Sequence, residues 1–213
     1  IIPVIIAFGG CSPSHSPDYN TCVLEVLRGY PLDGSFGYHW PKEGTWEGTT
    51  QDIVYDGVTL CTGDPQRRSF CCGLTYEVFF KAWERYDASR GRAFRIKGLT
   101  PGDLHEVRLR WFGDSHTGER RRLLQVAIES MGLGRSIPVE EAQAGDFIQF
   151  WRHNGSGHSA IFINWVYEQG RLAGVTYWST QGPTKGIGFR TEPINEKEGV
   201  KPDELYLARI LPE

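Results

Sequence analysis

The feature that most constrains this chain is a pair of adjacent cysteines, Cys71 and Cys72, at the start of an apolar run. Leu74, Val78 and Ala82 follow at steps of four, with aromatic residues between them, which predicts a largely buried helix over about 70–88. Both cysteines then lie in the first helical turn, where unpaired backbone N–H groups and the positive end of the helix dipole converge. That position lowers the pKa of a thiol and makes a thiolate available as a nucleophile.

The cysteine pair has two interpretations at this point. One is a catalytic cysteine, and the other is a buried structural thiol or half of a disulfide, because cysteine is also common in protein cores. Five cysteines fit two disulfides and one free thiol. One such arrangement pairs Cys11 with Cys22 and Cys61 with Cys72 and leaves Cys71 free, although spacing does not fix the connectivity.

Composition and charge narrow the classes of function. With 213 residues, 39% hydrophobic and 13% aromatic, the chain can build a sizeable core. A net charge of −3 gives no general attraction to nucleic acid or membranes, so neither is expected as a partner. Zinc and P-loop motifs are missing from the sequence, which predicts no metal and no cofactor.

The first residues, 1–11, are apolar and then reach Cys11. They fit either a buried strand or the tail of a secretory signal, and the stretch is too short to span a bilayer. Together with the number of cysteines, this stretch predicts a secreted, periplasmic or cell-envelope protein.

Residues 1–62 are predicted to form an N-terminal extension, and 63–213 a catalytic domain. The extension contains an aromatic-rich segment at 29–50 and a hairpin around Asp56-Gly57. Residues 91–117 look mixed, with a turn at Pro101-Gly102-Asp103.

A second amphipathic helix is predicted from Glu119 to Met131, ended by Gly132. Its arginines, at 120–122, suit a solvated helix face or contact with an anion. From residue 137 the pattern becomes β. The predicted strands lie at 147–151, 159–168, 172–180 and 205–210. A helix followed by an antiparallel meander indicates an α+β fold.

A thiolate nucleophile needs a base, and His158 is the best-placed histidine. It opens a strand directly after the glycine-rich loop at 153–157, where the backbone leaves room for a substrate. A third group should orient the imidazole. Tyr177, Ser179 and Gln181 share one face of the neighbouring strand, and Gln181 is preferred, with Ser179 as the substitute.

These motifs resemble the NlpC/P60 cysteine peptidases and the related CHAP amidases. The start of the predicted helix at 71–74 is similar to their Asp-Cys-Ser-Gly-Phe motif, 144–150 to their Pro-Gly-Asp-Leu strand, and 157–162 to their Gly-His-Val-Gly-Ile-Tyr strand. The resemblance implies a papain-like core, with the cysteine-bearing helix packed on an antiparallel sheet. It makes Cys71 the nucleophile and His158 the base, and it places the third polar residue on the strand that ends at Gln181.

The sequence departs from the family pattern at three points. Phe70 replaces the usual aspartate before the nucleophile, and the third residue is neither histidine nor the CHAP glutamate. The interval of 87 residues between Cys71 and His158 is long for a minimal domain, which implies a helical insertion at about 91–135.

The implied activity is hydrolysis of a peptide or amide bond, with bacterial cell-wall peptide as the substrate class. The backbone N–H of Cys71 or Cys72 would stabilise the oxyanion, and Tyr55 is the candidate for the tyrosine that the family places nearby. Two alternatives stay open. One is an acyltransferase or amidase with the same dyad, and the other is a non-catalytic extracellular module whose segment 29–50 binds a glycan or protein.

Overall fold

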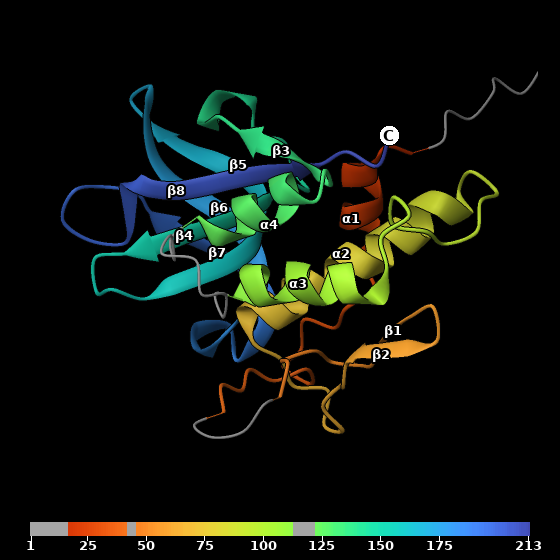
Figure 1. The fold of residues 1–213 in the computed structure, drawn as a ribbon. Helices are drawn as coiled ribbons and strands as arrows, with labels where there is room; N and C mark the ends of the chain where they lie inside the picture. Colours follow the sequence, from red (N-terminus) through yellow and green to blue (C-terminus); the bar gives the residue numbers. More distant parts are fainter. Residues whose placement is uncertain (1–16, 42–45, 113–121) are drawn as a thin grey trace, which may run out of the picture.

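The computed structural model describes residues 17–41, 46–112 and 122–213, and it confirms a mixed α+β fold. The helices lie against one side of an antiparallel sheet (Figure 1). The helices are α1 (Tyr19–Leu27), α2 (Cys71–Ala88), α3 (Pro101–Phe112) and α4 (Leu123–Ser130). In the described part of the chain, no helix combines the length and apolar character needed to cross a membrane.

The main sheet of the described ranges has six antiparallel strands in the order β3-β8-β4-β5-β6-β7. Two further strands form the predicted hairpin around Asp56-Gly57. The strand bounds are β1 (Ile53–Tyr55), β2 (Val58–Cys61), β3 (Gly134–Ile137), β4 (Phe147–Arg152), β5 (Gly157–Glu168), β6 (Arg171–Gln181), β7 (Gly186–Pro193) and β8 (Val200–Ile210).

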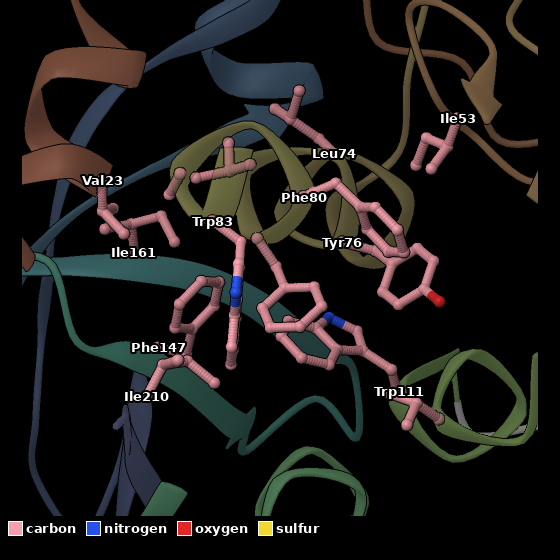
Figure 2. Close-up of a cluster of buried hydrophobic side chains, with 14 of the residues drawn as sticks. Val23, Ile53, Leu74, Tyr76, Phe80, Trp83, Trp111, Phe147, Ile161 and Ile210 are labelled. Carbon is pink, nitrogen blue, oxygen red and sulfur yellow. The ribbon is translucent and has the colours of Figure 1, made fainter. Parts of the chain in front are cut away.

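Helix α2 is the centre of the fold, as the apolar run predicted. Its residues Leu74, Val78, Phe79 and Ala82 are fully buried. Figure 2 shows side chains from α1, the β1 segment, α3 and the main sheet gathered around it. Because every layer packs against α2, the position of its first turn is set by most of the hydrophobic core.

The structure corrects the prediction for residues 91–112, and residues 113–117 of that segment lie outside the described residues. The predicted turn at Pro101 is instead the first turn of α3. Thr100 and Asp103 exchange hydrogen bonds, from Asp103 N to Thr100 Oγ1 at 3.2 Å and from Thr100 N to Asp103 Oδ2 at 2.8 Å. This reciprocal pair is a capping box, and proline at the first helical position supports it.

Other boundaries differ from the sequence prediction. Helix α4 begins at Leu123, and residues 119–121 of the predicted second helix lie outside the described residues. Strands β3 and β7 were not predicted, because their alternation is weak and glycines interrupt them. Within the predicted insertion at 91–135, the described elements include α3 and α4. That this segment is an insertion, and that a domain boundary lies at residue 62, both stay predictions.

The segment before β1 is held on α2 by a buried carboxylate and a close backbone contact. Glu77 accepts hydrogen bonds from Tyr30 Oη at 2.7 Å and from Thr50 N at 2.7 Å, and pairs with Lys81 at 2.9 Å. At Gly73, a Cβ would lie 2.3 Å from the carbonyl oxygen of Glu47. Gly73 therefore allows the preceding segment to lie directly against the first turn of α2.

Gly73→Ala should destabilise the protein by about 1–3 kcal/mol, because the added methyl group meets backbone that cannot move without disturbing the core. Gly102→Ala is the matched control. Its Cβ would find only Thr100 Oγ1, at 3.6 Å, within helix α3, so it should be neutral or stabilise by up to about 1 kcal/mol. Urea unfolding of both variants measures the difference, and equal stabilities would contradict the assignment.

Candidate active site

Cys71, His158 and Gln181, predicted from separate parts of the chain, all line one open cavity of about 840 Å³. Cys71 comes from the start of α2, His158 from the start of β5, and Gln181 from the end of β6. The fold thus brings together the three residues that the sequence proposed as a catalytic set.

Cys71 is the first residue of α2 and follows the extended residue Phe70. The pKa of its thiol lies well below the ordinary value. A hydrogen bond with the Cys72 thiol contributes most to this, and it acts together with the charge of His158, a hydrogen bond from His158 and the backbone N–H of Ser159. Burial opposes these effects but does not outweigh them. The site therefore favours the thiolate, the form that acts as a nucleophile.

His158 is 7% exposed and packs between aromatic rings. Its ring centroid lies 5.5 Å from that of Phe150 and 5.4 Å from that of Tyr177. Its Nε2 atom is buried without a hydrogen-bond partner among the described residues. Nε2 is therefore the position where an orienting acceptor is missing.

Two hydroxyl groups fix α2 against β5 next to these residues. Thr75, one turn after Cys71, lies 2.9 Å from the hydroxyl of Ser159, which directly follows His158. The indole Nε1 of Trp111 donates to Thr75 Oγ1 at 3.0 Å. The relative position of nucleophile and base is thus held by buried hydrogen bonds between the elements that carry them.

Gln181 lies in the right place but does not hydrogen-bond to His158. Continuing the pairing of Ile161 with Trp178 along β5 and β6 puts His158 opposite Gln181. The Gln181 Oε1 atom accepts from Tyr177 Oη at 3.0 Å and from Arg190 at 3.4 Å. Its Nε2 atom is buried and has no partner in the described structure.

Ser179, the substitute third residue, hydrogen-bonds to the backbone of β5 and not to His158. Its hydroxyl donates to the carbonyl oxygen of Ser159 at 2.8 Å, which ties β6 to β5. The hydroxyl of Ser179 is therefore not directed at His158, and Gln181 stays the candidate for the third residue.

Tyr55 was the wrong candidate for the oxyanion tyrosine. Its side chain is 2% exposed, it packs against Phe80 and Phe94, and its hydroxyl accepts from Ile96 N at 3.0 Å. It belongs to the core because alternation along β1 turns it toward α2 rather than toward the cavity.

Tyr38, which sequence reasoning missed, lines the cavity together with Cys71. It is held there because the backbone of residues 37–39 pairs with Ser69, through Ser69 N to Gly37 O at 3.0 Å and His39 N to Ser69 O at 2.9 Å. Its pKa is raised by burial and by the charges of Cys71 and Cys72. The only signal in the sequence was the aromatic density of segment 29–50.

The predicted disulfides are not supported. No disulfide joins Cys61 to Cys72, so the predicted bridge between them is not formed. Burial raises the pKa of Cys61 to about 12, and Cys72 instead contacts Cys71. Cys22 forms no disulfide either, so the predicted pairing of Cys11 with Cys22 is not supported; Cys11 itself lies outside the described residues.

A buried charged network lies beyond Gln181, and it could not be predicted from the sequence because β7 was not recognised as a strand. Glu192 of β7 is 4% exposed and accepts from Arg152 at 2.6 and 2.7 Å and from the Tyr177 hydroxyl. Burial opposes ionisation, yet the hydrogen bonds from Arg152 and Tyr177 hold the pKa of Glu192 below its usual value.

Comparisons with known proteins do not assign the chain to a family. It matches no protein-family model, no curated protein and no solved structure. In the ranges that the structure describes, no group of three or more His, Cys, Asp or Glu side chains is placed to hold a metal ion. The chemistry of the site therefore rests on its own geometry.

Alkylation of Cys71 by iodoacetamide should stay fast as the pH falls. An ordinary thiol loses about tenfold in thiolate for each pH unit below about 8.5. Because the pKa of Cys71 is lowered, its thiolate persists below that value and is lost only when the pH falls through the lowered pKa. Mass mapping between pH ~6 and ~9 measures this, and a profile parallel to a model thiol would contradict it.

Cys72 provides a matched pair of variants. Cys72→Ala removes the hydrogen-bond partner and should move the midpoint of Cys71 alkylation to higher pH, because the thiolate loses its largest stabilising contact. Cys72→Ser keeps a donor of similar size and should leave the midpoint near that of the natural protein. Equal midpoints in both variants would show that Cys72 does not tune the nucleophile.

Proposed function

We propose that this protein is a cysteine hydrolase that cleaves a peptide or amide bond through Cys71 and His158. The observation that carries the proposal is a cysteine of lowered pKa at a helix N-terminus, hydrogen-bonded to a histidine within an open cavity. A structural thiol would be expected to show the opposite shift, as buried Cys61 does.

The first step is acylation. The Cys71 thiolate attacks the carbonyl carbon and forms a C–S bond, while the carbonyl oxygen becomes an oxyanion. Backbone N–H groups at the start of α2, that of Cys72 among them, and the Tyr38 hydroxyl are the donors available for this charge. The C–N bond then breaks as the imidazole of His158 gives its proton to the departing amine.

Deacylation returns the enzyme to its starting state. The neutral imidazole of His158 takes a proton from water, which attacks the thioester carbonyl. The C–S bond breaks, the carboxylic acid leaves, and the thiolate–imidazolium pair is restored.

Gln181 is the residue proposed to orient His158. The Tyr177 hydroxyl has one proton, and the carboxylate of Glu192 is the stronger acceptor for it. Turning the Gln181 amide by 180° lets its Nε2 donate to Tyr177 and directs Oε1 away from it. A movement of the turned side chain toward His158 would then let Oε1 accept from His158 Nε2, with loss of the 3.4 Å contact with Arg190.

The arrangement of elements supports a papain-like core of the NlpC/P60 or CHAP type as part of the proposal. A helix bears the cysteine at its start, and two adjacent antiparallel strands supply the base and a third polar residue. Cell-wall peptide is the substrate class that this resemblance suggests, and location outside the cytoplasm belongs to the same proposal.

Cys71→Ala should abolish hydrolysis, and His158→Ala should lower kcat by at least about 10²-fold, since the nucleophile and the general base are removed. Cys72→Ala should keep measurable activity. Release of new amino groups from a muropeptide digest is the assay. Equal activity in Cys71→Ala and the natural protein would end the assignment of Cys71 as the nucleophile, and no hydrolysis by the natural protein would favour a binding module.

Tyr38→Phe tests the oxyanion role separately. Loss of the hydroxyl should lower kcat by about 10²-fold with little change in KM, because the contact forms mainly in the transition state. Tyr55→Phe is the matched control, since that hydroxyl lies in the core, and its effect should appear in stability rather than in kcat.

A further inference from the structure

The cavity carries an unbalanced positive charge. Arg152 and Arg190 both line it, and of the residues that the structure describes no aspartate or glutamate does. The thiolate and imidazolium of the proposed dyad cancel one another. The charge that acts on a bound substrate therefore depends on the two guanidinium groups and on Glu192, the carboxylate that contacts both of them.

Arg152 is already neutralised. Its Nε and Nη2 atoms donate to the two carboxylate oxygens of Glu192 at 2.7 and 2.6 Å, in the fork geometry typical of a strong pair. Its side chain is 15% exposed, so this pair belongs to the floor of the site rather than to its open surface.

Arg190 has no such partner. Its contact with Glu192 is 3.4 Å long, to an oxygen that Arg152 and Tyr177 already share, and its contact with Gln181 is also 3.4 Å. No other carboxylate in the described ranges pairs with it. The side chain is 33% exposed at the cavity. One carboxylate thus serves two guanidinium groups, and the outer one is left with capacity for another anion.

The lining of the cavity combines aromatic side chains, among them Trp151 of β4, with polar ones. Aromatic side chains of segment 38–40 and α3 form one part, including Trp40, which is 57% exposed, and Phe112. Arg190, together with Gln181 and Gly182, belongs to the part formed by β6, β7 and their connection. A ligand that spans the cavity would place an apolar or ring-shaped part on the aromatic side and an anionic part at Arg190.

We propose that the substrate carries a carboxylate or another anionic group close to the scissile amide, and that Arg190 binds it. Arg190 is then a specificity-determining residue that selects anionic over neutral amides. This inference rests on the proposed function, because it assumes that the bond to be cleaved lies at Cys71.

Two pairs of alkylating probes test the inference without knowledge of the substrate. Iodoacetate and iodoacetamide share a leaving group but differ in charge, and bromoacetyl-glycine and bromoacetyl-glycinamide place the same difference one residue further from the sulfur. For at least one pair, the ratio of anionic to neutral rates at Cys71 should exceed that of a small neutral thiol by about tenfold or more. The excess should shrink in high salt.

Arg190→Gln should remove that excess, whereas Arg190→Lys should keep part of it. The excess is taken as the ratio of anionic to neutral rates within each variant, so that any change in the general reactivity of Cys71 cancels. Arg171→Gln is the matched control, since it makes the same charge change at the exposed opposite end of β6. A Cys71 that reacts rapidly with the neutral probes but shows no excess for either anionic probe, or an excess that Arg190→Gln does not reduce, overturns the inference. Failure of the neutral probes to react rapidly would instead contradict the proposed function itself.

Discussion

The contact between the Thr75 and Ser159 hydroxyls is the interaction on which the site depends. It joins the first turns of α2 to the start of β5, and Trp111 of α3 secures it from a third element. In a buried setting such hydrogen bonds are costly to leave unmade, so they fix one relative position of helix and sheet. Cys71 and His158 meet because each lies within one turn or one residue of this contact.

Helix α2 is held along its length by apolar packing, and apolar packing alone would allow the helix to shift along its axis. Aromatic and aliphatic side chains surround α2 on several sides (Figure 2). Buried polar contacts then fix where neighbouring segments lie along the helix. Glu77 holds the segment around Thr50, and Gly73 admits its backbone against the helix. Apolar packing thus holds the helix in the core, and the polar contacts near its start set the position of the first turn, which carries Cys71.

Near His158, the sheet contains a buried network of charged and polar side chains. Glu192, Arg152 and Tyr177 share a buried network, and removing one partner from such a network leaves the others unsatisfied. The network connects the third candidate residue to the wall of the cavity that bears Arg190. Orientation of the base and recognition of an anion are therefore coupled through one carboxylate in the proposed function.

The sequence by itself determined α2, the β-hairpin and most strands of the main sheet, because apolar periodicity and helix-end chemistry are local properties. It also predicted Cys71, His158 and Gln181, three residues that line one cavity. It could not show that Pro101 begins a helix, that β7 exists, or that Tyr38 rather than Tyr55 reaches the cavity. It also did not show that Cys61 and Cys72 stay unbridged. Those features depend on which distant backbones lie together, such as segment 37–39 with Ser69 and β7 with β6. Contacts of that kind depend on the packing of the whole core, so a local sequence pattern does not predict them.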